Sequence, residues 1–169
     1  AAFMYAPAEK VDGSILLASI ERCYFGFRRR RRDVRQATSC ECDACARIPD
    51  LNLKFVAHNG LVRHQKMAGL DELIGTDVIV VHRMLKNHVV EELGLKAYAL
   101  LTQACIDATG IDPAALGMVA STEAYEGVGS TASWVLDLEH RWQEEDARAR
   151  VRVTAADALF TASIPIVVP

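Results

Sequence analysis

The stretch of residues 51–87 constrains the fold more than any other part of this chain of 169 residues. Apolar and mostly polar residues alternate through residues 51–57, which is the period of a strand with one buried face. Asn59-Gly60 follows, and both residues tolerate the positive φ angles that a type I′ turn needs. We therefore predict a β-hairpin whose second strand occupies residues 61–67.

A helix is predicted directly after this hairpin. Beyond Gly75, apolar residues recur at spacings of three and four, as on the buried face of a helix. They are Val78, Val81, Met84 and Leu85. The helix would lie across the hairpin and cover one face of it.

The remaining elements follow from similar local signals. Upstream, we predict a short strand at residues 1–6 that ends at Pro7, and a long amphipathic helix from Ser14 to about Arg35 with Asp12 as its N-cap. Downstream, the patterns indicate a strand at 96–102, a helix at 103–109 closed by Gly110, and a hairpin of strands 119–127 and 130–138. This order predicts an α+β fold in which helices cover a largely antiparallel sheet.

Composition narrows the class of protein. The net charge of −3 argues against a nucleic-acid partner, and no apolar run approaches the roughly 18 residues that cross a bilayer. The cysteine number, five, is odd, and no signal peptide is visible, so we expect reduced thiols and a cytoplasmic location. The chain begins without Met in strand-like sequence, so we expect it to be a piece of a longer protein.

Five consecutive arginines, residues 28–32, stand at the end of the long predicted helix. Consecutive residues point all the way round a helix, so one interpretation is a solvated end that complements the helix dipole. The other is a patch that binds phosphate or an anionic partner.

Three cysteines follow at C-x-C-x-x-C spacing: Cys40, Cys42 and Cys45. Three thiolates at this spacing would supply three of the four tetrahedral ligands that zinc prefers, with His58, His64 or Cys23 as a candidate fourth. Ordinary reduced thiols in a loop, or a redox pair, are the alternatives.

Two segments carry a family resemblance. Ala57-His58-Asn59-Gly60-Leu61-Val62 resembles the Ile-His-Thr-Gly-Pro-Val hairpin of class III adenylate and guanylate cyclases. Residues 75–84, Gly-Thr-Asp-Val-Ile-Val-Val-His-Arg-Met, resemble the Gly-x-x-Val-Asn-x-Ala-x-Arg-Met segment that follows it there. Together with the cysteine cluster, the chain is more similar still to an uncharacterised bacterial family related to those cyclases. The resemblance implies a ferredoxin-like, cyclase-like sheet over residues 1–138, without the first strand and helices.

The resemblance also implies roles for particular residues. Arg83 matches the transition-state arginine of the cyclases, and Glu72, Gly75 and Asp77 fall along their nucleotide-binding segment. Ile79 replaces the asparagine that positions the ribose. The two aspartates that hold magnesium or manganese in these enzymes have no counterpart in this chain.

Each of these residues also has a structural interpretation. Arg83 would then be a surface arginine paired with a carboxylate. His58 and His82 would pack in the fold, because no serine, cysteine or aspartate motif is placed to use them.

Two functions remain open. The first is an inactive cyclase-like module that forms a homodimer and has a regulatory or nucleotide-binding role. The alternative is an active nucleotidyl cyclase whose metal-binding aspartates lie upstream of Ala1.

The last part of the chain is assigned separately. Residues 139–150 are rich in charge and predict a connecting helix or linker, and residues 151–169 are strand-like. That tail resembles the entry to a START-like, polyketide-cyclase-type domain.

Overall fold

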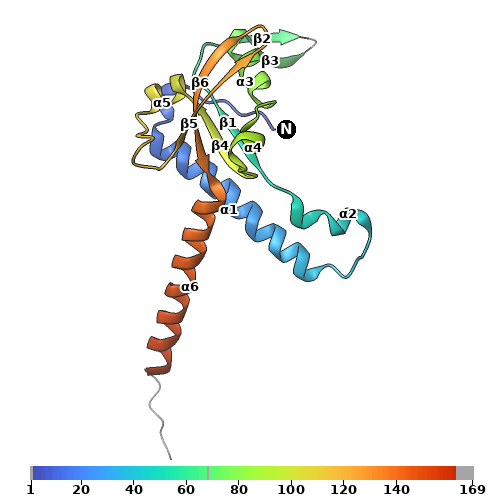
Figure 1. Cartoon of the computed structure of the whole chain (residues 1–169), viewed down its shortest axis with the longest axis vertical. Coiled ribbons are helices and arrows are strands. Elements are labelled where there is room, and N and C mark those ends of the chain that lie inside the picture. Colours follow the sequence, from blue (N-terminus) through green and yellow to red (C-terminus); the bar gives the residue numbers. More distant parts are fainter. Residues whose placement is uncertain (1, 68, 163–169) are drawn as a thin grey trace, which may run out of the picture.

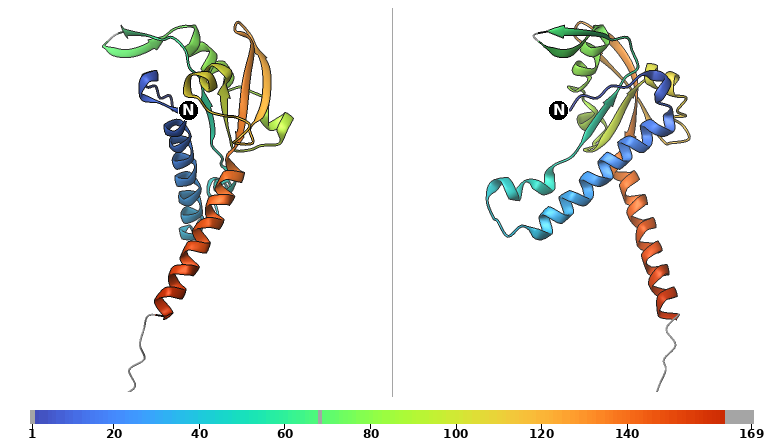
Figure 2. Two further views of the ribbon diagram at one scale, coloured as in Figure 1. Left: turned by 90° about the vertical axis from the view of Figure 1, so that its left-hand side faces the viewer. Right: turned by 180° about the vertical axis from the view of Figure 1, so that it is seen from behind.

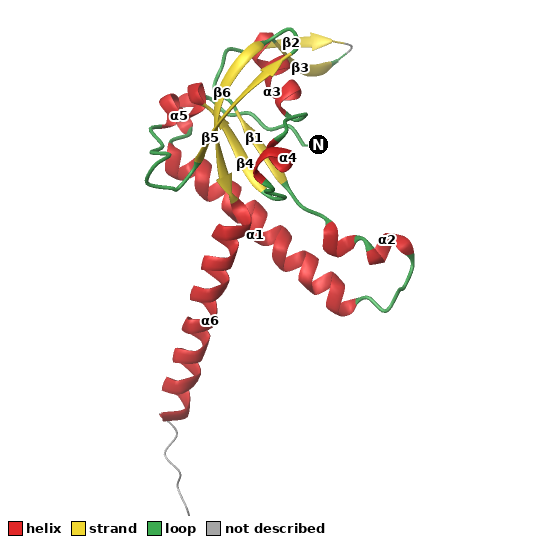
Figure 3. Ribbon diagram, in the orientation of Figure 1, coloured by secondary structure: helices red, strands yellow, loops and turns green. Residues whose placement is uncertain are grey.

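The computed structural model describes residues 2–67 and 69–162. Their helices and strands form one mixed sheet with helices on both of its faces and a separate two-stranded ribbon (Figure 1; Figure 3). The α-helices are α1 Gly13–Ala37, α2 Asp43–Ala46, α3 Thr76–Met84, α4 Val89–Leu93, α5 Gln103–Thr109 and α6 Leu138–Ala162, and short 3-10 helices are η1 Ala8–Lys10 and η2 Ile48–Asp50. The strands are β1 Lys54–Ala57, β2 Arg63–Met67, β3 Leu70–Ile74, β4 Tyr98–Thr102, β5 Val119–Tyr125 and β6 Gly129–Asp137.

The main sheet has the strand order β1-β4-β6-β5. β4 and β6 are antiparallel, as are β6 and β5, but β1 runs parallel to β4 with Lys54 opposite Tyr98. The predicted α+β class is confirmed. Two of the three pairings in the main sheet are antiparallel, in line with the predicted largely antiparallel sheet, and the parallel pair of β1 and β4 makes the sheet mixed. A parallel pair requires a long crossover, and here residues 58–97, which carry the ribbon, α3 and α4, provide it.

The central strand β4 is buried along its whole length, because helices cover both faces of the sheet. Its side chains alternate between two apolar clusters. Ala99 and Leu101 pack in the cluster that includes Ile20 and Tyr24 of α1, and Leu100 packs with Met84 of α3 in the other. Figure 2 shows α1 and α3 on opposite sides of the sheet.

Several elements match their sequence signals closely. The Asp12 side chain accepts a hydrogen bond from the Ile15 N–H at 2.8 Å, which confirms the predicted N-cap of α1. Helix α5 spans the predicted residues 103–109 and ends at Gly110, whose φ of 67° is the left-handed value that glycine adopts readily. The predicted hairpin near the end of the domain is present as β5 and β6.

The predicted hairpin around Asn59-Gly60 is wrong. β1 pairs with β4, and β2 instead pairs with β3, with Arg63 opposite Ile74. Gly60 is needed for a different reason: a Cβ atom on it would lie 2.6 Å from the Cβ of Asp77. The Asn-Gly dipeptide therefore serves a close approach of loop and helix rather than a hairpin turn.

The strand predicted for residues 1–6 is also wrong over residues 2–6, which belong to no sheet. Their aromatic side chains instead contact two histidines. The Phe3 ring stacks on His82 at 5.7 Å between centroids, and Tyr5 meets His64 edge-on at 5.2 Å.

The strand-like assignment of residues 151–169 fails over residues 151–162, because these continue α6. Ion pairs at helical spacing precede this segment, from Arg148 to Glu144 and from Arg150 to Asp146, and they favour continuation of the helix. Residues 163–169 lie outside the described part of the chain, and so does any START-like domain that they begin. Within the described ranges, no helix combines the length and the apolar character that crossing a bilayer requires.

Candidate functional site

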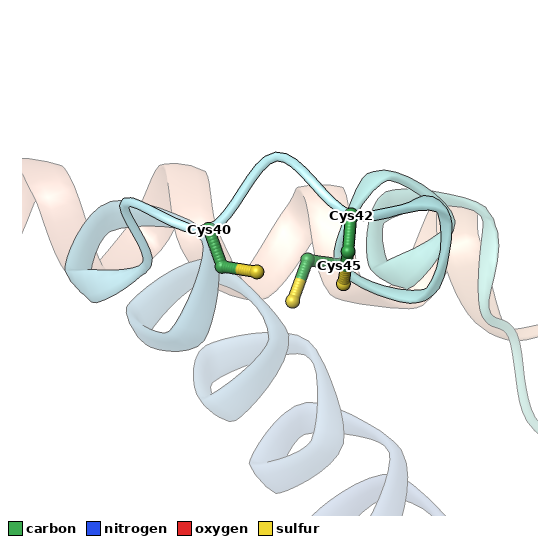
Figure 4. A group of neighbouring side chains, drawn as sticks. All are labelled: Cys40, Cys42 and Cys45. Atoms are coloured by element: carbon green, nitrogen blue, oxygen red, sulfur yellow. The ribbon is translucent and has the colours of Figure 1, made fainter.

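The three clustered cysteines form the first candidate site. Cys40 lies in the loop after α1, Cys42 caps the N-terminus of α2, and Cys45 belongs to α2. Their sulfur atoms all lie within 4.8 Å of one another, and Figure 4 shows the three side chains gathered on one side of the turn. Sulfurs bound tetrahedrally at about 2.3 Å from a zinc ion would be about 3.8 Å apart. Only small side-chain adjustments separate the observed arrangement from a metal-binding one.

Hydrogen bonds within this group shift the pKa values of Cys42 and Cys45 in opposite directions. The Cys45 N–H, followed by the thiols of Cys40 and Cys45, stabilises the Cys42 thiolate and lowers the pKa of Cys42 to about 7. The pKa of Cys45 rises to about 11, because its thiol donates a hydrogen bond to Cys42 and interacts with Cys40. Of these two thiols, Cys42 therefore has the lower pKa and loses its proton more readily than Cys45.

None of the three predicted fourth ligands, His58, His64 and Cys23, belongs to the cysteine group. Among the described residues, the metal-competent group consists of the three cysteines alone. Cys23 is exposed on α1, and His64 contacts Tyr5. Both ring nitrogens of His58 already have partners in a different part of the fold.

His58 links two elements at the crossover. Its Nδ1 lies 2.9 Å from the hydroxyl of Thr102, and its Nε2 lies 3.2 Å from Oδ1 of Asp77. The Thr102 hydroxyl also accepts the Cys105 N–H at 3.2 Å and thereby caps α5. A neutral His58 that donates from Nε2 and accepts at Nδ1 satisfies every member of this chain, a tautomer that we assign from the network.

Asp77 ties the start of α3 to the loop before β2. Its Oδ2 accepts the Leu61 N–H at 2.6 Å, while its Oδ1 contacts His58. The Leu61 N–H holds the pKa of the Asp77 carboxyl below its usual value, against a smaller opposing effect of burial, and His58 lowers it further. Of the residues predicted to bind nucleotide, Gly75 lies nearby, since a Cβ on it would lie 3.0 Å from the Leu61 carbonyl oxygen.

Arg83 and Glu72 do not join this network. The Arg83 guanidinium lies 3.7 Å from the carboxylate of Glu126, and both side chains are well exposed, at 43% and 90%. Glu72 is exposed on β3, opposite Gln65. The structure thus brings Gly75, Asp77 and His58 together and leaves Arg83 in a weak surface ion pair.

Sequence reasoning missed the internal role of the arginine run. Arg28 donates to Glu139 at 2.9 Å, and the hydroxyl of the fully buried Tyr24 donates to the same carboxylate at 2.7 Å. Arg28 and Arg29 both lie over the ring of Trp142, at 5.8 and 5.6 Å from its centre. The arginine run therefore fastens α1 to α6. The acidic residues that follow β6 in the sequence could have indicated this contact.

Other arginines of the run also have partners in the protein. Arg31 donates to the Leu51 carbonyl and to the Asn52 side chain, and Arg32 lies 4.0 Å from Asp146. Arg29, Arg30 and Arg32 are nevertheless exposed, so the run is solvated in part, and the binding of phosphate or an anionic partner stays a prediction.

The fold and the cysteine group define an α+β protein with an exposed cluster of three thiols. Residues 1–92 match the model of a family described as "Protein of unknown function (DUF2652)", and the chain belongs to this family. The match includes the cysteine group and, of the Asp77 network, His58, Leu61 and Asp77 but not Thr102.

One curated relative is an uncharacterized protein of Mycobacterium tuberculosis, Rv2561/Rv2562. It is 37% identical over 113 residues, which cover 66% of this chain and 50% of that protein. The chain thus spans about half the length of this relative. No solved structure matches the chain significantly.

Proposed function

We propose that this chain is a non-catalytic module related to the class III nucleotidyl cyclases, with a regulatory or nucleotide-binding role in the cytoplasm. The observation that carries the proposal is the use of Asp77. It stands in the segment that resembles the nucleotide-binding part of those enzymes, yet its two oxygens hold Leu61 and His58. Each oxygen of this carboxylate already has an internal partner, so a metal ion or a ribose would have to compete with the contacts to Leu61 and His58.

Two neighbouring positions support the same conclusion. Ile79, in place of the ribose-positioning asparagine, exposes 53% of a side chain that forms no hydrogen bonds. Arg83 is engaged with Glu126, and an arginine accelerates phosphoryl transfer only where metal and sugar are already held. Magnesium or manganese would be needed only if a longer protein supplied the aspartates that bind them.

The test is an assay for cyclic AMP and cyclic GMP with Mg²⁺ or Mn²⁺, in which we expect no turnover. Turnover that Arg83→Ala abolishes would instead establish an active cyclase. Binding of ATP and GTP is measured separately by isothermal titration calorimetry. Arg83→Ala should weaken any such binding, and Arg148→Ala is the control because its side chain is 62% exposed on α6.

We further propose that the module forms a homodimer through the surface around α3. This surface exposes several large apolar side chains, and contiguous exposed apolar surface often marks a contact site. They are Leu61, Val62, Ile74 and Ile79. A two-fold symmetric dimer would cover the same patch on both copies.

Light scattering at tens of micromolar tests this contact. The wild-type chain should have the mass of a dimer, and Ile79→Asp should have the mass of a monomer. Val151→Asp is the control, because Val151 is 69% exposed but lies on α6. A monomeric wild-type protein would contradict the proposal.

A further inference from the structure

We infer that Cys40, Cys42 and Cys45 bind one zinc ion, which fastens the segment between α1 and β1 and keeps one coordination position open to solvent. This inference is independent of the proposed function, because it uses none of the residues that resemble the cyclases.

The segment between α1 and β1 has no core of its own. In residues 38–53, which we call the cysteine segment, no residue is buried, and both α2 and η2 lack buried residues. Figure 1 shows the segment folded back beside the far end of α1, away from the sheet. A helix as short as the four-residue α2 is not stable alone in water. Small units without a core are commonly held by a metal or a disulfide.

The other contacts of the cysteine segment hold only one of its ends. Arg31 donates to Leu51 and Asn52, close to the start of β1. In the described part of the chain, the residues around Cys40 and α2 form no comparable hydrogen bond or ion pair with another element, beyond the backbone bonds of their own turns. A metal at the three sulfurs would join the loop after α1 directly to α2, where the fold otherwise provides least support.

The three sulfur atoms already lie close enough together to bind one metal ion after small adjustments. Three Sγ atoms from one short segment lie within 4.8 Å of one another, although the three cysteines are not linked by a disulfide. Thiolates select zinc over hard cations such as magnesium and calcium, which prefer oxygen.

The cysteine group supplies one ligand fewer than zinc takes. Zinc in proteins takes four ligands, and the group in the described residues supplies three. Cys40 and Cys42 are both exposed, so water can reach the metal from the side that the protein leaves uncovered. Zinc sites with three protein ligands and a water differ from closed structural sites in that their fourth position can exchange.

The first experiment measures zinc in the whole chain, purified under reducing conditions without added metal. We expect close to one zinc per chain in the wild type and none in Cys42→Ser. Cys23→Ser is the matched control and should retain the metal, because Cys23 is an exposed cysteine outside the group. Near-ultraviolet circular dichroism of Trp134 and Trp142 checks folding, since both lie in the sheet and helix core rather than in the cysteine segment.

The second experiment needs no variant. Trypsin cleavage after Arg47, which is exposed in the cysteine segment, should slow about tenfold when free zinc exceeds its dissociation constant tenfold. Cobalt substitution should give the absorption spectrum of a tetrahedral site with thiolate ligands. This spectrum should change when a small exogenous thiol or imidazole occupies the fourth position.

Three results would overturn the inference. These are a metal-free wild type whose cleavage at Arg47 is unaffected by zinc, full zinc retention by Cys42→Ser, and one zinc per two chains in a dimer that dissociates on chelation. The last result would show that a second copy, and not solvent, occupies the fourth position.

Discussion

The carboxylate of Asp77 accepts the backbone N–H of Leu61 at 2.6 Å, so that a helix side chain fixes the loop between two strands of different sheets. The other oxygen of Asp77 continues this link to His58. The arrangement explains why the loop is held close to α3, and it allows direct tests.

Asp77→Asn should lower the free energy of unfolding by about 1–2 kcal/mol. The amide oxygen would accept the Leu61 N–H without a negative charge, and the amino group would face His58, whose ring would have to change tautomer to accept from it. Urea denaturation measures the loss. Asp107→Asn is the control, because among the described residues the Asp107 side chain bonds to Gln103 alone, one helical turn away on an exposed surface, and the substitution should change stability by less than about 0.5 kcal/mol. Equal effects of the two substitutions would contradict the role of Asp77.

The stabilisation from Asp77 should depend on pH. Its pKa in the folded protein lies below the usual 3.8, so the unfolded chain binds the proton more tightly. The contribution is therefore complete above about pH 3.8 and is lost as the pH falls through the lower folded value. Urea midpoints of wild type and Asp77→Asn should converge on acidification below this pH, and a constant difference would refute the assignment.

Substitution of two glycines by alanine should have opposite effects. Gly60→Ala would force a Cβ against the side chain of Asp77 and should destabilise the protein by about 1–3 kcal/mol. Gly26→Ala, inside α1, meets no atom within 4 Å and should stabilise by about 0.5–1 kcal/mol, since alanine is the better helix former. Thermal or urea unfolding of both variants decides the matter.

Glu139→Gln should weaken the contact between α1 and α6. The carboxylate accepts hydrogen bonds from Tyr24 and Arg28, and we expect a loss of about 1 kcal/mol when its charge is removed. Glu145→Gln is the control, because its partner Arg152 is 70% exposed on the same helix. A similar loss in both variants would show that Glu139 has no special role.

Local signals predicted the elements that local chemistry determines. Asp12 fixes the start of α1 through a hydrogen bond to a residue close in sequence. Gly110 fixes the end of α5 through its left-handed backbone conformation. The cysteine group was likewise predictable, because six residues contain all three thiols.

Partner choice was not predictable in the same way. The alternation of residues 51–57 predicts a strand but not its partner, and β4 lies 44 positions further along the chain. The contact of Arg28 with Glu139 and the chain from Asp77 through His58 to Thr102 also depend on residues brought together only by the folded sheet. Residues 151–162 show a different error: two valines suggested a strand, whereas the four alanines of this segment favour the helix that α6 continues.

The parallel pairing of β1 with β4 has a kinetic consequence. Tyr125 and Gly129 meet across a four-residue separation, whereas Lys54 must find Tyr98 after the whole crossover has been ordered. Loop closure of this length costs entropy before any contact is gained, so we expect β5, β6 and β4 to assemble first and β1 to dock last. In pulse-labelling hydrogen exchange, the amides of β6 should therefore gain protection before those of β1. The strand β1, which leads into the His58 loop, would then be the last strand of the sheet to become fixed.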